Sequence, residues 1–342
     1  MIRDLVLASG GSSPVGVNWT YQSDMAVEWA KNTFTPNAST HYPTSIAWSG
    51  TQFCVVGAEG SCATSPDGVN WTQQPGLKSC GFDHFVPAVI CWGGNRFCVV
   101  GGGGQCATSV DGVTWTLGPG TAPSQALLYL YPLDIVWSGS RFCVVGFDVA
   151  ESAPYGAPGV IATSPDGVTW SYQHVGTLAV TSIAWTGEYF CAVSGHSSLI
   201  NPVGLPTAYV SYDGASWQPY YLPSQQTYQP SIAWGGGRFC VIGSISQAAQ
   251  QENACTSPDG RTWTQQPGYS VAPSGRSKVQ SVENQFVTFG TSVKTSPDGV
   301  NWMLRPSASG YYINDTAWSG SRLCAVGTAP PEYTNGIAII SP

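Results

Sequence analysis

A seven-residue pattern, Ser-x-Asp-Gly-x-x-Trp, recurs along the whole chain. Residues 65–71 carry it as Ser-Pro-Asp-Gly-Val-Asn-Trp, and near-copies begin at Ser109, Ser164, Ser211, Ser257 and Ser296. A further copy at residues 13–19 has Val15 in place of the aspartate. The successive aspartate positions (15, 67, 111, 166, 213, 259 and 298) lie 39 to 55 residues apart. This period is typical of a four-stranded propeller blade and not of a helix-pair repeat. We call the pattern the box.

Two β-rich runs joined by a Gly-containing turn precede each internal box. The first such hairpin spans residues 45–57, and similar segments occur at 89–101, 134–146, 182–195, 231–243 and 315–327, with a degenerate one at 280–290. A third strand, such as residues 61–64, leads into the box, and a fourth, such as 69–73, follows it. Strand runs bounded by tight turns indicate antiparallel hairpins. The sequence therefore predicts an all-β fold, a seven-bladed β-propeller of four-stranded antiparallel blades.

The two ends of the chain complement each other. The chain begins with a box and a fourth strand at residues 17–22 that no hairpin precedes, and it stops at a third strand, residues 337–341, that no fourth strand follows. Pairing of the N- and C-terminal strands would close the ring and protect the sheet edges. We expect one domain spanning residues 1–342, with residues 1–12 as an extension outside the ring.

Composition narrows the possible partners. Only 9% of residues are charged and the net charge is -7, so no basic stripe is available for nucleic acid or for an anionic membrane surface. No apolar run approaches the ~20 residues of a membrane span. The first eight residues are too short and too acidic for a convincing secretory signal, so we expect a soluble chain without membrane insertion.

Cysteine usage favours thiols over a disulfide framework. Most of the eleven cysteines occupy matching positions inside expected strands, where cysteine behaves as a small apolar residue. Two pairs, Cys54 with Cys62 and Cys98 with Cys106, have a separation of eight. We expect each pair to lie directly opposite on neighbouring strands, close enough for a bond. The second-strand residues Cys143, Cys191, Cys240 and Cys324 are expected to be free thiols.

The box resembles the Asp-box of sialidase-like (BNR-type) propellers, with one residue fewer between the Asp and the Trp. The resemblance implies a structural turn, in which the Asp accepts backbone N-H bonds and the Gly supplies a positive φ. The residues assigned to this structural role are Asp67, Asp111, Asp166, Asp213, Asp259 and Asp298. Metal binding by these aspartates would need several oxygens converging on one site, and they are distributed around a ring. We therefore expect no metal and no cofactor.

Repeated Trp and Arg residues are interpreted as architecture. The repeated Trp residues are Trp48, Trp92, Trp137, Trp185, Trp234 and Trp318, and the repeated Arg residues are Arg96, Arg141, Arg238 and Arg322. A Trp beside a tight turn in each blade favours packing between blades over sugar stacking. An arginine cluster clamps the substrate carboxylate in true sialidases, but here whole blades separate the arginines and the Phe-Arg-Ile-Pro-type motif is absent. No catalytic residue is predicted, and we expect a protein that is not an enzyme.

Binding is expected on the face opposite the boxes, because its connections differ in length and are rich in aromatic residues. Loops on a rigid scaffold concentrate binding residues, and Tyr with small polar residues is typical of recognition surfaces. The alternative is that these aromatic residues pack against one another to fill long loops. The binding candidates are Phe82, His84, Phe85, Tyr129, Tyr131, Phe147, Tyr155, His196, Tyr220, Tyr221, Tyr228, Tyr311 and Tyr312.

Three functions are compatible with the sequence. The favoured one is a virion-associated subunit, such as a bacteriophage tail-fibre, receptor-binding or decoration protein, which contacts other protein subunits or cell-surface glycans. The second is a secreted or surface lectin or adhesin, and the third is a sialidase-like glycoside hydrolase. A flat apolar patch on one face would favour a docked subunit, and carboxylates with arginine in the central channel would favour the hydrolase. The expected location is a virion or the extracellular space.

Overall fold

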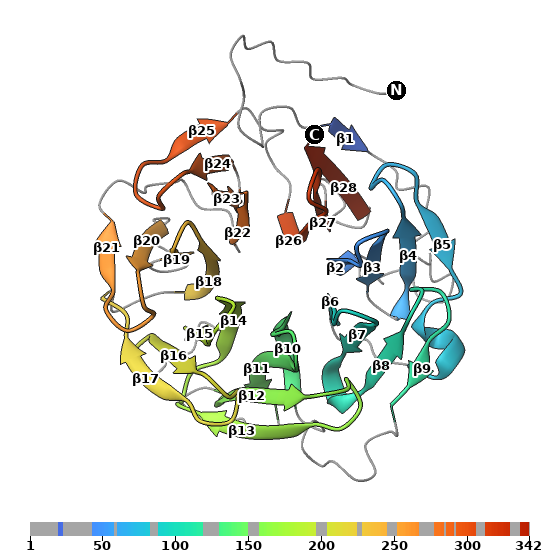
Figure 1. Ribbon diagram of the computed structural model, residues 1–342, viewed down its shortest axis with the longest axis horizontal. Helices are drawn as coiled ribbons and strands as arrows, with labels where there is room; N and C mark the ends of the chain where they lie inside the picture. The colour runs from blue at the N-terminus through green and yellow to red at the C-terminus, as the bar shows by residue number, and fades with distance from the viewer. Residues whose placement is uncertain are drawn as a thin grey trace, which may run out of the picture.

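A computed structural model describes residues 20–22, 43–57, 60–82, 88–118, 130–149, 157–195, 204–223, 228–244, 252–266, 277–283, 285–290, 292–305, 312–328 and 336–341. Within these segments, 28 strands form seven four-stranded sheets in which every pairing is antiparallel. The sheets follow one another around a ring, with the first strand of each blade innermost and the fourth outermost (Figure 1). The predicted all-β propeller of four-stranded antiparallel blades is confirmed.

The blades follow the chain in order. The first three consist of β2 (Pro43–Trp48), β3 (Phe53–Gly57), β4 (Cys62–Ser65) and β5 (Thr72–Gln74); β6 (Val89–Trp92), β7 (Phe97–Val100), β8 (Cys106–Ser109) and β9 (Thr116–Leu117); and β10 (Leu130–Trp137), β11 (Phe142–Asp148), β12 (Gly159–Ser164) and β13 (Ser171–Val175). The next two consist of β14 (Val180–Trp185), β15 (Phe190–Ser194), β16 (Thr207–Ser211) and β17 (Gln218–Tyr221); and β18 (Tyr228–Gly235), β19 (Arg238–Ser244), β20 (Glu252–Ser257) and β21 (Thr264–Gln266).

The sixth blade consists of β22 (Lys278–Val282), β23 (Gln285–Phe289), β24 (Val293–Ser296) and β25 (Met303–Arg305). The seventh consists of β26 (Tyr312–Trp318), β27 (Leu323–Thr328) and β28 (Gly336–Ser341), with β1 (Thr20–Gln22) as its outer strand. Short 3-10 helices, η2 (Leu77–Cys80) and η3 (Gly102–Gly104), lie in the connections of the first two blades. No helix in the described segments is long and apolar enough to cross a membrane.

The two ends of the chain meet in the seventh blade. β28 pairs with β27 and, on its other edge, with β1, where Thr20 faces Ile340 and Gln22 faces Ala338. The predicted closure by the terminal strands is therefore confirmed. The expected extension, residues 1–12, lies outside the described residues.

The core is a series of apolar layers between neighbouring blades. Residues alternate between the two faces of each second strand, as the two-residue period of a strand requires. In the first blade, Phe53 and Val55 pack with Cys324 and Val326 of the seventh blade, whereas Cys54 and Val56 pack against the second blade. Each blade thus buries both faces against its neighbours, as expected of a repeat that cannot form a core alone.

The box forms a self-contained turn. In the first complete copy, Asp67 Oδ1 accepts hydrogen bonds from the Ser65 hydroxyl at 3.0 Å and from the Val69 and Asn70 N-H groups at 2.8 Å each. Gly68 has a φ of 74°, which the turn requires and which glycine adopts at low cost. Trp71 covers the turn, and its Nε1 donates to the Gly68 carbonyl at 2.8 Å. The aspartates of the five later boxes make the same contacts with their own turns.

The predicted placement of the paired cysteines is wrong in register. Cys54 lies opposite Thr64, and Cys62 lies opposite Val56, so this pair is diagonal. Its two Sγ atoms are 3.7 Å apart. Cys98 and Cys106 have the same offset. The turn between the strands contains Gly60 and shifts the register by two residues from the symmetrical arrangement that the spacing suggests. All eleven cysteines are thiols.

Candidate functional site

Two faces of the ring differ in what they carry. The turns between strands one and two and the box turns between strands three and four lie on one face, which we call the turn face. The second and fourth strands end at the opposite face, which we call the loop face. The first strands line the central channel (Figure 1), and described residues of the channel border a cavity toward each face. Asp134, Ser182 and Lys278 line both cavities, so they mark the boundary between them.

Edge strands surround the channel, because no further strand pairs with the inner edge of β2, β6, β10, β14, β18, β22 or β26 in the sheets described. Unpaired N-H groups along such edges need other acceptors. In five blades the side chain at one position of the first strand supplies such an acceptor. We call the seven residues at this position the belt. The belt consists of Ser45, Val89, Asp134, Ser182, Ser231, Lys278 and Asp315.

Belt side chains accept hydrogen bonds from the first strand of the next blade. Ser45 Oγ accepts from Ile90 N-H at 3.1 Å, Ser182 Oγ from Ile232 N-H at 3.2 Å, and Ser231 Oγ from Val279 N-H at 3.2 Å. A shift in register occurs just before the belt residue in five of the blades. A bulge of this kind re-aims a side chain, and here the belt side chain reaches the neighbouring blade.

Val89 and Lys278 break this series, because neither side chain can accept a hydrogen bond. In each case the belt residue of the next blade is an aspartate, Asp134 after Val89 and Asp315 after Lys278. Asp134 Oδ1 accepts from its own neighbour Ile135 N-H at 2.9 Å, and Oδ2 accepts from Ile183 N-H at 3.1 Å. The second oxygen also accepts from the Ser182 hydroxyl at 2.7 Å. A carboxylate thus serves two backbone donors where a serine serves one.

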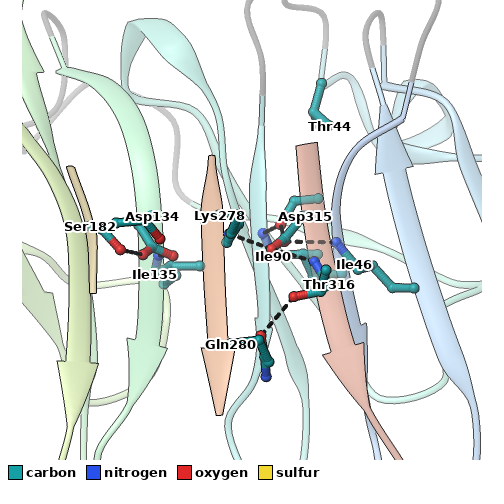
Figure 2. Close-up of polar contacts among 12 residues, drawn as sticks. Thr44, Ile46, Ile90, Asp134, Ile135, Ser182, Lys278, Gln280, Asp315 and Thr316 are labelled. Atoms are coloured by element: carbon teal, nitrogen blue, oxygen red, sulfur yellow. Dashed lines mark hydrogen bonds and ion pairs between the residues drawn. The ribbon is translucent and has the colours of Figure 1, made fainter. Parts of the chain in front are cut away.

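Asp315 makes the same arrangement after Lys278. Its Oδ1 accepts from Thr316 N-H at 2.8 Å, and its Oδ2 accepts from Ile46 N-H at 3.0 Å and from the Ser45 hydroxyl. Lys278 Nζ donates to Oδ1 of Asp315 in a close ion pair (Figure 2). The belt therefore contains two carboxylates and one ammonium group.

The electrostatics of Asp134 are set first by its removal from water. Burial raises the pKa of Asp134, and the Asp315 charge adds to this effect. Lys278 acts in the opposite direction, as do the bonds from Ser182 and Ile183. The Lys278 charge and the hydrogen bonds thus offset only part of the cost of removing the Asp134 carboxylate from water.

The loop-face cavity has a volume of about 410 Å³ and is bounded by aromatic, aliphatic and polar groups. Tyr131 on β10 and Phe147 on β11 face each other across the two strands, and their rings stack with centroids 4.8 Å apart and planes 19° apart. Leu133 and Ile313 add apolar surface, and Asp134 lies at the inner end. The cavity thus combines an aromatic wall with a half-buried carboxylate.

The structure separates the predicted binding residues. Tyr131 and Phe147 lie in the loop-face cavity, although in strands and not in loops. Phe82 is 1% exposed and packs against Gly101 in the core, so it is not on the binding surface. Tyr221 is 71% exposed on the outer strand β17, and Tyr220 beside it packs partly against the core.

Other candidates are only partly described. Tyr228 begins β18 and Tyr312 begins β26, both inner strands. The remaining candidates, His84, Phe85, Tyr129, Tyr155, His196 and Tyr311, lie outside the described residues.

The belt was missed by the sequence reasoning. Its signal is a polar residue three positions before the repeated Trp in the first strand, as in Ser45 and Asp134. A polar residue in an otherwise apolar run indicates a buried hydrogen-bonding role. The apolar strand signature masked this signal.

Repeated Trp and Arg residues occupy structural positions. Trp48 lies 4.5 Å from Phe53 between ring centroids, and the equivalent pair recurs in the next four blades. Arg141 donates to the Asp213 carbonyl in the box of the next blade, and Arg322 likewise donates to the Asp67 carbonyl at 3.0 Å. These arginines connect blades, and among the described residues no group of three His, Cys, Asp or Glu is placed to hold a metal ion.

No protein-family model matches the chain, and no curated protein matches it. Several solved structures share its fold. A structure of YCF48 bound to D1 peptide has a TM-score of 0.58 at 14% identity, over 94% of this chain and 96% of that one. PorZ, a surface component of the type-IX secretion system of Porphyromonas gingivalis, gives 0.56 at 9% identity, over 84% of this chain but only 35% of its own. BamB from Moraxella catarrhalis gives 0.51 at 11% identity, over 87% and 85%. This chain is similar in fold to these propellers.

Proposed function

We propose that this propeller is a non-catalytic recognition protein that binds a polypeptide segment at the loop-face mouth of its channel. The observation that carries the proposal is the cavity of about 410 Å³ in which Tyr131 stacks on Phe147. Its size lies within the ~300–1,000 Å³ range of ligand pockets, which combine apolar walls with a few polar groups. Aromatic side chains in pockets are frequent anchors of protein interfaces.

Fold likeness adds limited support. The YCF48 structure is of a protein bound to a peptide, so the architecture accommodates a polypeptide ligand in that protein. The finer roles that composition suggests, a virion-associated subunit or a glycan-binding adhesin, remain proposals alongside it, as does kinship with Asp-box propellers.

The proposal includes no catalytic step. Asp134 and Asp315 lie in the channel, where paired carboxylates would suit a glycosidase. Each of them, however, already accepts hydrogen bonds from two backbone N-H groups and one serine hydroxyl. These bonds give both residues a structural role. Release of fluorophore from a fluorogenic sialoside by the protein, abolished by Asp134→Asn, would contradict this interpretation.

A peptide-display selection tests the binding function. Immobilised protein is panned against a random peptide library, in parallel with a Tyr131→Ala/Phe147→Ala variant and with the box variant Asp166→Ala. We expect enriched peptides that bind the wild type and the box variant but lose affinity at least tenfold with the double variant, since hot-spot truncation costs ~2 kcal/mol or more. No enrichment, or peptides that bind all three proteins equally, would refute the proposal. Enrichment on a glycan array in place of peptides would assign the surface to glycans.

A further inference from the structure

The charges around the channel do not balance. The belt has two carboxylates, Asp134 and Asp315, against the single ammonium of Lys278, and Lys278 is bonded directly to Asp315. Within the described part of the chain, no Lys, Arg or His nitrogen forms an ion pair with Asp134. Among the described residues, the two carboxylates thus share one cation at the inner end of the loop-face cavity, because Lys278 contacts Asp315 and acts on Asp134 through its charge.

Asp134 also retains capacity for another donor. Its two oxygens provide about four acceptor sites, and three are used by Ile135 N-H, Ile183 N-H and the Ser182 hydroxyl. The carboxylate lines the cavity and is held by these bonds, so it is oriented before any ligand arrives. A charged donor at the free site would recover part of the desolvation cost of the carboxylate.

The wall beside Asp134 suits an organic cation. The Tyr131 and Phe147 rings attract cationic groups near their faces, and they provide apolar contact for an aliphatic stem. Leu133 and Ile313 also line the cavity and extend the apolar surface available to such a stem. A small hydrated metal ion would not use such a wall, whereas a lysine or arginine side chain would.

We infer that the loop-face cavity receives an arginine or lysine side chain of the bound polypeptide, with its charged head at Asp134 and its stem beside Tyr131 and Phe147. This inference rests on the proposed function and specifies its partner. The net charge of -7 also favours a cationic segment as partner.

Titration with matched small probes tests the inference on the full chain. The probes are N-acetyl-arginine amide and N-acetyl-citrulline amide, which share shape but differ in charge, with N-acetyl-glycine as an anionic probe; binding is followed by saturation-transfer NMR. We expect the arginine probe to bind roughly tenfold more tightly than the citrulline probe, because only the former forms a charge-assisted bond. Equal binding of these two, or preference for the anionic probe, would overturn the inference.

Variants locate the probe. Asp134→Asn should remove most of the preference for arginine, and Tyr131→Leu should weaken arginine binding roughly threefold. Tyr172→Leu, on the outer strand of the same blade and 45% exposed, should leave binding unchanged. Equal effects of the two tyrosine substitutions would overturn the inference.

A Lys278→Met variant is the control that separates a charge effect at Asp134 from general damage to the fold. Removal of the ammonium leaves more negative charge beside the cavity, so arginine binding should become tighter, whereas a generally damaged protein would bind less. Weaker binding by a Lys278→Met variant that melts as the wild type does would also overturn the inference.

Display peptides that depend on Tyr131 but lack Arg and Lys would refute this inference alone, whereas absence of any peptide would refute the proposed function.

Discussion

Single residues in the belt compensate for one another across blades. Val89 offers no acceptor to Ile135 N-H, and Asp134 in the next blade supplies one from its own side chain while serving Ile183 N-H with its other oxygen. Asp315 does the same after Lys278. Polar residues on an apolar strand are thus explained by the donors that their neighbours leave unpaired.

A double-mutant cycle tests this compensation. Asp134→Ala leaves two inner N-H groups without an acceptor and should lower the free energy of unfolding by about 2–4 kcal/mol. In a Val89→Ser background, the introduced hydroxyl can accept from Ile135 N-H as Ser45 does from Ile90, so the loss should be smaller by about 1 kcal/mol. Urea unfolding of the four proteins measures the coupling. An equal loss in both backgrounds would show that Val89 and Asp134 are independent.

Box aspartates should make stability depend on pH. The N-H groups of Ser216 and Ala215 lower the pKa of Asp213 to about 2, against ~3.9 in an unfolded chain. Because the folded pKa is the lower one, the stabilising contribution is present above about pH 4 and is lost as the pH falls toward 2. Asp213→Asn keeps an acceptor but does not titrate. We expect its melting temperature to fall less than that of the wild type between pH 5 and pH 2.5, and parallel curves would contradict the assignment.

In several blades, the cysteine of the second strand packs under the box glycine of the next blade. A Cβ on Gly260 would lie 3.2 Å from Cys191 Sγ and 3.1 Å from a Val210 methyl, and Gly299 has the same relation to Cys240 at 3.3 Å. The repeated cysteine is therefore a small filler under the glycine of the next box, and burial raises the pKa of its thiol.

Overpacking at this contact should destabilise the ring. Cys191→Leu adds volume under Gly260 and should cost about 1–3 kcal/mol, because the box turn cannot move without breaking its own bonds. Cys191→Ala removes only a sulfur atom and should cost less. Denaturant unfolding compares the two. A leucine variant as stable as the alanine variant would show that the layer between these blades is loosely packed.

The fold was predictable in detail because its signals are local and repeated. The box, the hairpin glycine and the Phe-Cys-Val-Val alternation each encode one piece of a blade, and the unmatched strands at the chain ends encode closure.

The candidate site was less predictable than the fold. The aromatic composition of the expected loops points to Tyr131 and Phe147, although both lie in strands, whereas the role of Asp134 depends on Val89 in another blade. The cysteine register failed for a similar reason, since the turn geometry, and not the sequence separation, sets which residues face each other.

Ring closure makes a prediction for the whole molecule. Deletion of residues 1–22 removes β1 and exposes the edge of β28, so the full ring should unfold at a lower temperature in a single transition. Deletion of residues 1–12 leaves β1 in place and serves as the control, with unchanged melting. Calorimetry distinguishes these cases. A 1–22 deletion as stable as the full chain would show that the β1–β28 pairing contributes nothing to closure.

Hydrogen–deuterium exchange with a selected peptide bound tests the central claim that recognition belongs to the loop-face mouth of the channel. Residues 130–134 of β10 and 145–148 of β11 form or adjoin the wall of that cavity, so their amides should become protected when the peptide binds. The box turns, such as residues 164–170, lie on the turn face and should exchange at the rate of the free protein. Protection of the box turns, with residues 130–134 and 145–148 unchanged, would contradict the account and assign recognition to the opposite face.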